Sequence, residues 1–406
     1  MAIVKIRRYK FWIILLFLIS SAILVIVLGF IKEYRRYLSE KMAAEAEQRR
    51  VYTDRLNNAD SSTNCAEVQE VEYYTYSGDD PLWEENNKFG IYIYAEVDEF
   101  FDRAEELVNS GDGDWGYVLI PYNVKDKNFE KWNNVFKKLN EKHLIPVFQL
   151  HDVDTDDYKD QTEEAAAFLN RFVWPIRYRY ISVYNEPNDR KFWYDRIDPK
   201  EYAEILDYTI DVFKEENPDF FMMNGAFNVT ASSGDNHMDS LEYMRRMEVA
   251  EPGIFKRLDG WASHSYPQPN FSGDPYNEGR WSIKAYEVEL SYLRKVLKIG
   301  KDLPVFITET GWAHAEGADY NSSYLPVDTI SEYFEKAYED VWLKDEKVRA
   351  VMPFTIRYDS PFDHFSWLNA DDVPYKHFDV VRDMEKEEGK PPVRIVNTIK
   401  VGGCGL

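Results

Sequence analysis

The chain has few cysteines and no histidine pattern typical of a metal site. Two cysteines cannot form a zinc site alone, and the seven histidines lack His-x-His and His-Glu-x-x-His spacing. The sequence also lacks a Gly-x-Ser-x-Gly elbow and a phosphate-binding P-loop. We therefore predict neither a metal nor a cofactor, and we exclude esterases and nucleotide hydrolases of these types.

Positive charge is scarce beyond the first 50 residues. The chain has 49 Lys and Arg against 72 Asp and Glu, a formal charge of −23. Residues 1–50 sum to +6, so the other 356 residues sum to −29. Binding to DNA or RNA depends mainly on neutralising phosphates, so we predict no nucleic-acid partner. Hydrophobic residues at 44% exclude global disorder, and the 16% of aromatics suits a surface that handles carbohydrate.

One long segment contains no charge at all. Phe11 to Ile31 reads FWIILLFLISSAILVIVLGFI, long enough to cross a bilayer as a helix. A cleavable signal peptide is the alternative, but the apolar run is too long and Lys32-Glu33 follows it. We predict a membrane anchor at 11–31, a cytoplasmic segment at 1–10 with Lys and Arg, and an extracytoplasmic remainder. Residues 32–88 are interpreted as a helical stalk and linker.

From residue 89 onward, short apolar runs alternate with amphipathic stretches. Eight runs read as strands, and six long amphipathic stretches between them read as helices, a pattern that favours parallel strands covered on both faces. We predict a (β/α)8 TIM barrel of the α/β class over 89–386, with a tail at 387–406. An open doubly wound sheet is the alternative, but the first strand ends without a glycine-rich loop. The predicted strands are 89–95, 116–122, 145–150, 180–184, 220–226, 258–263, 304–308 and 350–355.

Two glutamates stand at the ends of predicted strands on opposite sides of the barrel. Glu186 follows the fourth strand and Glu309 ends the seventh, so their carboxylates can face each other across the mouth. Retaining glycoside hydrolysis needs such a pair, about 5–5.5 Å apart, one protonated and one ionised. We expect the acid, Glu186, to have the higher pKa of the two.

The residues around these glutamates resemble those of clan A glycoside hydrolases. Asn185-Glu186-Pro187 followed by Glu309 on a later strand is similar to the pattern of that clan, and Phe192-Trp193 and Tyr202 extend the resemblance to family 39. The resemblance implies that Glu186 is the acid/base and Glu309 the nucleophile. It further implies substrate-binding roles for five residues, with Tyr266 also bonding the nucleophile and Trp312 stacking on a sugar ring: Asn185, His151, His264, Tyr266 and Trp312.

The sequence thus predicts a membrane-anchored retaining glycosidase whose partner is an oligo- or polysaccharide. A catalytically silent barrel that binds glycans or a cell-surface partner is the alternative from another class. Transglycosylation by the same residues is a further outcome, and the sugar and the endo or exo mode stay open.

The two cysteines lie outside the predicted barrel, Cys65 before it and Cys404 near the end of the tail. Because the first strand begins and the last helix ends at the same face of a barrel, these segments are expected to be close. An extracytoplasmic location permits oxidation. We predict a Cys65–Cys404 disulfide, and two free thiols are the alternative.

Overall fold

The structure, a computed structural model, describes residues 69–78, 82 and 86–401. The predicted membrane segment, Phe11 to Ile31, and both cysteines lie outside the described residues. No helix among the described residues is long and apolar enough to cross a membrane. The anchor at 11–31 therefore stays a prediction.

Eight parallel strands form a closed ring, as the alternation of apolar runs predicts. Five of them pair in the order β2-β3-β4-β5-β6 and three in the order β7-β8-β9. Parallel bridges from Met223 to Gly260 and from Phe89 to Val351 join the two sheets at both seams. The strands are β2 (Gly90–Tyr92), β3 (Tyr117–Asn123), β4 (Ile145–His151), β5 (Arg179–Val183), β6 (Phe220–Asn224), β7 (Trp261–His264), β8 (Val305–Glu309) and β9 (Val348–Val351).

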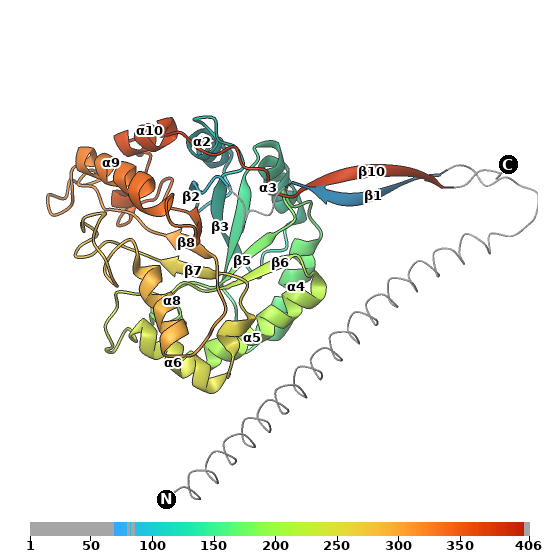
Figure 1. The fold of residues 1–406 in the computed structure, drawn as a ribbon, viewed down its shortest axis with the longest axis horizontal. Helices are drawn as coiled ribbons and strands as arrows, with labels where there is room; N and C mark the ends of the chain where they lie inside the picture. Colours follow the sequence, from blue (N-terminus) through green and yellow to red (C-terminus); the bar gives the residue numbers. More distant parts are fainter. Residues whose placement is uncertain (1–68, 79–81, 83–85, 402–406) are drawn as a thin grey trace, which may run out of the picture. The chain divides into compact units, whose positions relative to one another are not determined.

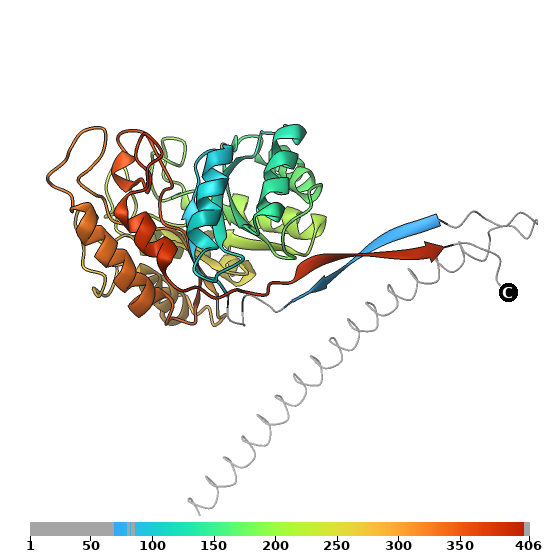
Figure 2. The same cartoon turned by 90° about the horizontal axis from the view of Figure 1, so that it is seen from above.

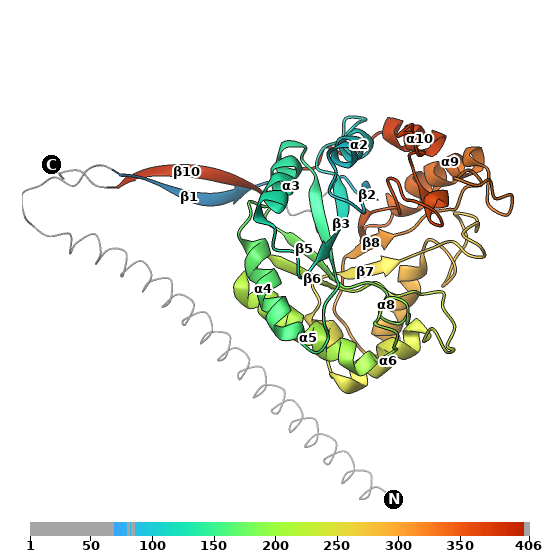
Figure 3. The same ribbon diagram turned by 180° about the vertical axis from the view of Figure 1, so that it is seen from behind.

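Helices surround this ring of strands (Figures 1 and 3). The amphipathic stretches predicted from the sequence are all helical, although α4 begins earlier than expected and the last one continues into a π-helical turn. Helices α6 and α10 were not among those predicted. The helices are α2 (Asp98–Val108), α3 (Phe129–Glu141), α4 (Tyr158–Asn170), α5 (Pro199–Glu216), α6 (Ser240–Ala250), α7 (Ile254–Arg257), α8 (Ala285–Lys295), α9 (Val327–Lys336), the π turn η1 (Ala337–Trp342), the 3-10 turn η2 (Asp363–Phe365) and α10 (Lys376–Asp383).

The strands bury both faces, which explains their nearly continuous apolar sequences. Aromatic side chains fill the inside of the barrel: the ring of Tyr180 lies 4.9 Å from that of Phe306 and 5.1 Å from that of Phe221. The outward side chains of the strands pack against the helices in a second, larger cluster. The barrel is thus a solid core, and its carboxyl-end loops are the place for a functional site.

A two-stranded sheet lies outside the ring, in segments for which we predicted no strands. β1 (Gln69–Ser77) falls in the predicted stalk and linker, and β10 (Val393–Val401) in the predicted tail. The two strands run in opposite directions (Figure 2), and Asn397 Nδ2 donates to Thr75 Oγ1 at 2.8 Å. Alternating polar and β-branched residues, as in Val393-Arg394-Ile395, are the signal for β10 that the irregular composition of the tail obscured.

This pairing bears on the predicted disulfide. Because β1 and β10 are antiparallel, the start of β1 and the end of β10 lie at the same end of the two-stranded sheet. Cys65 precedes β1 by four residues and Cys404 follows β10 by three. We expect non-reducing peptide mass spectrometry of the full chain to find the two cysteine peptides linked. Full alkylation of both thiols without a reductant would contradict the disulfide.

Candidate active site

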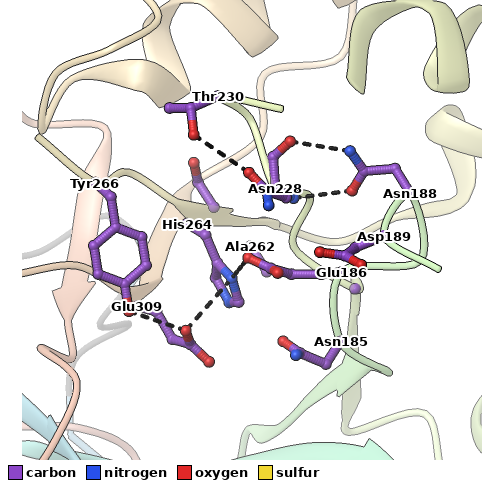
Figure 4. Close-up of polar contacts among 12 residues, drawn as sticks. Asn185, Glu186, Asn188, Asp189, Asn228, Thr230, Ala262, His264, Tyr266 and Glu309 are labelled. Carbon is purple, nitrogen blue, oxygen red and sulfur yellow. Dashed lines mark hydrogen bonds and ion pairs between the residues drawn. The ribbon is translucent and has the colours of Figure 1, made fainter. Parts of the chain in front are cut away.

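The two glutamates predicted to be catalytic meet at the carboxyl ends of the strands, on either side of one histidine (Figure 4). Nδ1 of His264, the last residue of β7, lies 2.9 Å from Glu186 Oε1 and 3.6 Å from Glu309 Oε2. The two oxygens are therefore no farther apart than the sum of these distances, about 6.5 Å. The side chains of Glu186 and Glu309 are 12% and 13% exposed, so both carboxylates are shielded from bulk water yet accessible.

A tight turn after β5 brings Glu186 into the mouth. Tyr184 and Glu186 have φ values of 72° and 37°, and residues other than glycine rarely adopt positive φ. The Glu186 amide donates to the carbonyl of Ala226 at 2.9 Å. Gly225 makes this approach possible, because a Cβ there would lie 2.5 Å from the Val183 oxygen. Such backbone strain persists only where neighbouring contacts hold it, and it is concentrated at functional sites.

Asn188 is the main support of this turn. Its side chain is fully buried, its Nδ2 donates to the carbonyls of Asn228 and Met238, and its Oδ1 accepts from the Asn228 amide. Tyr202 of α5 adds a second support, since its hydroxyl donates to the Val183 carbonyl and accepts from the Gly225 amide. The turn is therefore fixed from the β6 side and from the helix side.

The loop after β7 holds Glu309. Tyr266 donates its hydroxyl to Glu309 Oε2 at 3.1 Å, and the Ser265 amide donates to the Glu309 carbonyl at 3.1 Å. Thr310 Oγ1 in turn donates to the Ser265 carbonyl at 2.6 Å. Both the side chain and the backbone of Glu309 are thus fixed by residues 264–266.

Burial and mutual charge set the protonation of this cluster. Desolvation raises the pKa of Glu309 to about 7, opposed by the nearby His264 charge and assisted by that of Glu186. We predicted that Glu186 would have the higher pKa of the two, but the group whose pKa is raised is Glu309, and burial is the main reason. Burial lowers the pKa of His264, but the charge of Glu309 and the bond to Glu186 outweigh it, so this pKa is raised. The two carboxyl groups thus favour the protonated form of the imidazole that lies between them.

The other predicted substrate-binding residues differ in how close they come to this cluster. Asn185 lies next to Glu186, and its Oδ1 accepts from Gln149 Nε2 at 3.0 Å. His151, at the end of β4, is 39% exposed, and its Nδ1 lies 3.3 Å from Asp152 Oδ2. His264 and Tyr266 contact the glutamates directly; the resemblance implies such a contact for Tyr266, whereas for His264 it implies a place in the sugar-binding subsite.

Trp312 does not have the exposed ring that stacking on a sugar requires. It is 2% exposed, its Nε1 donates to the Gly273 carbonyl at 2.7 Å, and its ring packs on those of Tyr333, Phe334 and Trp342. The position after Glu309 suggested a cleft residue, but the chain turns the indole towards α9. We therefore omit Trp312 from the proposed substrate contacts.

Two further residues belong to the site although we did not select them from the sequence. Gln149 is buried and orients Asn185. Tyr92, at the end of β2, has a pKa raised by burial and then by the charge of Glu309, so it lies within electrostatic range of that carboxylate. Their positions at strand ends were the available signal. In the described part of the chain, no group of three or more His, Cys, Asp or Glu residues can hold a metal ion.

The fold resembles that of solved glycoside hydrolases. A monomeric β-xylosidase from Caulobacter crescentus CB15 shares 14% identity over 79% of this chain and 71% of that chain, with a TM-score of 0.50. A β-glucuronidase from Bacteroides uniformis shares 12% identity over 77% of this chain, with a TM-score of 0.50, but only 37% of the enzyme is covered. The sequence matches no protein-family profile and no curated protein sequence. The chain therefore has an α/β barrel fold like that of glycosidases.

The support of the Glu186 turn can be tested by replacing Asn188. Asn188→Ala leaves three partly buried backbone groups without their partner, which we expect to lower the free energy of unfolding by about 3 kcal/mol. Urea denaturation measures this change. Asn277→Ala, at an exposed position, is the matched control and should change it by less than about 0.5 kcal/mol. Equal stability of the two variants would contradict the assigned support.

Proposed function

We propose that this protein is a retaining glycosidase in which Glu186 is the acid/base and Glu309 the nucleophile. The observation that carries the proposal is the approach of one imidazole nitrogen to both carboxylates, which bounds their separation at about 6.5 Å. This upper limit includes the separation of about 5–5.5 Å used for double displacement and reaches only the lower edge, about 6.5 Å, of the range used by inverting enzymes. The barrel fold it shares with glycosidases supports the same reaction class.

In the proposed reaction, ionised Glu309 attacks the anomeric carbon while Glu186 protonates the leaving oxygen. Glu186 then removes a proton from water, which attacks the same carbon and releases the sugar from Glu309. Tyr266 donates to Glu309 and His264 holds both carboxyl groups, so the pair stays aligned as charge moves between them. Asn185 is placed by Gln149 to bond the hydroxyl beside the anomeric carbon.

Finer assignments stay proposals. Membership of family 39 rests on the residues around Asn185-Glu186-Pro187, and the identity of the sugar remains to be measured. A location outside the cytoplasm, with an anchor at 11–31, rests on the uncharged segment and the basic residues before it. An oligo- or polysaccharide is the proposed substrate.

Replacing each glutamate separates the two roles. We expect Glu309→Ala to abolish turnover of aryl β-glycosides, because no covalent intermediate forms. Added azide should restore release of the aryl group and give a glycosyl azide of inverted configuration. With Glu186→Ala, azide should instead attack the glycosyl-enzyme and give a glycosyl azide of retained configuration. Product stereochemistry by NMR measures both results.

A screen of the full chain on aryl β-glycosides and polysaccharides comes first. Absence of turnover on the whole panel, together with binding of a glycan, would favour the catalytically silent barrel. Unchanged turnover by Glu309→Ala would exclude the assigned nucleophile, and Glu201→Gln, an acidic residue of α5 bonded to Arg196, is the control that should keep turnover.

The pH dependence follows from the raised pKa of Glu309. Because the nucleophile must be ionised, kcat/KM should fall as the pH drops below about 7. The hydrogen bond from Tyr266 lowers this pKa, so Tyr266→Phe should raise it and move the acidic limb to higher pH. Tyr208→Phe removes a tyrosine–carboxylate bond on the outside of the barrel and should leave the limb in place. If the acidic limb of kcat/KM stays at the same pH in Tyr266→Phe, the limb does not report the ionisation of Glu309, which would contradict its assignment as the nucleophile.

A further inference from the structure

Helix α8 buries a carboxyl group where its packing pattern calls for an apolar residue. The residues of α8 that face the barrel are Ala285, Tyr286, Glu289 and Leu293, and Glu289 is fully buried. Burial without compensation raises the cost of a charged carboxylate, and desolvation raises the pKa of Glu289 to about 7, despite the hydrogen bonds from Ser263 and Trp261. A buried carboxyl group on the barrel-facing side of a helix destabilises the fold, so we expect it to have a function that explains it.

Glu289 bonds the outward face of the strand that carries His264. Ser263 Oγ donates to Glu289 Oε2 at 2.5 Å, and Trp261 Nε1 donates to the same oxygen at 3.1 Å. Both partners belong to β7 and are fully buried. Glu289 Oε1 has no hydrogen-bond partner among the residues that the structure describes.

Side chains of residues 261–266 point to both faces of the barrel wall, some to α8 and some to the catalytic carboxylates. Trp261 and Ser263 point to Glu289, whereas His264 and Tyr266 contact the two catalytic carboxylates. The pairing register of β7 with β8 shifts between Ser263 and His264. The extra residue is Thr308 of β8, so the ladder between the two strands is interrupted beside His264, and a contact from outside the barrel can anchor β7 there. Glu289 supplies that anchor.

A chain of hydrogen bonds continues from Glu289 to the proposed nucleophile. Since Ser263 gives its proton to Glu289, Ser265 is the donor in the 3.1 Å contact between the two serine hydroxyls. Ser265 Oγ accepts from the Tyr286 amide of α8, and the Ser265 amide donates to the Glu309 carbonyl. A change at Glu289 therefore reaches residues 263–266 and Glu309 through bonded groups.

We propose that Glu289 is a positioning residue for the catalytic pair: it anchors β7, and with it His264 and Tyr266, from outside the barrel. When it is ionised, Glu289 is also one of the negative charges that favour protonation of His264. The proposal rests on the proposed glycosidase function. The charged groups that face His264 are Glu186 after β5, Glu309 of β8 and Glu289 of α8, all three acidic, with the Tyr266 ring beside it. Glu289 is itself faced by His264 and by Arg280 of the loop before α8.

The test compares Glu289→Gln with Glu287→Gln in the full chain. Glutamine keeps the shape and can accept from Ser263 and Trp261, but it removes the charge. We expect kcat to fall about tenfold with KM within about threefold, and the acidic limb of kcat/KM to move to higher pH, because a less protonated His264 no longer lowers the pKa of Glu309. Glu287→Gln, at an exposed position of the same helix, should match the parent chain.

A direct titration keeps the outcome independent of turnover. The ring proton of His264, assigned by its loss in His264→Gln, is followed by NMR against pH. We expect the pKa of His264 to be lower in Glu289→Gln than in the parent chain, because one of the negative charges that raise it is removed. If no substrate is turned over, the proposed function fails, yet this shift still tests the role of Glu289.

Two results would overturn the proposal. One is a Glu289→Gln variant whose kcat, acidic limb of the kcat/KM profile and His264 pKa all equal those of the parent chain. The other is a variant that loses stability and kcat while the His264 titration is unmoved, which would show that Glu289 is only a packing residue. Should Glu289→Gln fail to fold, Ser263→Ala removes one bond of the anchor and should lower kcat with KM unchanged, and parental kcat there would equally overturn it.

Discussion

The contact of His264 with two carboxylates is the constraint on which the rest of the site depends. Two glutamates this close repel each other when both are ionised, and protonation of the imidazole between them offsets that repulsion. Because His264 is almost fully buried, its charge acts in a medium of low polarity, where it counts for more than at the surface. The turn at Glu186 and the bonds of residues 264–266 to Glu309 can be understood as the means of keeping both carboxylates on this imidazole.

That constraint explains where the structure accepts strain. The φ of Glu186 is positive, and its amide is tied to Ala226 through a gap that only Gly225 permits. The Asn188 side chain makes three hydrogen bonds that support the same turn. Most of the barrel, by contrast, consists of apolar strands whose packing tolerates many sequences of similar volume. The demand for particular residues is thus concentrated at the carboxyl ends of β5, β6 and β7.

The sequence was sufficient for features that depend on one element at a time. Eight apolar runs predicted eight strands, and their polar ends pointed to Glu186, Glu309, His264 and Tyr266. Features that depend on which elements contact each other could not be predicted from the sequence. Trp312 follows Glu309 in the chain, yet its direction is set by packing against α9. The pairing of β1 with β10 joins segments more than 300 residues apart, and neither segment indicates the other.

Glu289 belongs to this second group, and it shows how a site extends past the residues that touch substrate. On a helical wheel, Glu289 is a single acidic residue among the apolar residues that face the barrel, and the sequence gives no reason for it. A leucine there would remove the desolvation cost but would leave the buried donors of Trp261 and Ser263 without their acceptor. Apolar residues at all three positions would avoid both costs, so stability alone gives no reason for a carboxylate. The reason lies across the strand: the same backbone that binds Glu289 on its outer face presents His264 on its inner face. Proteins accept such costs where a charge must be held in place for activity, and the loss in stability is then part of how the site is built.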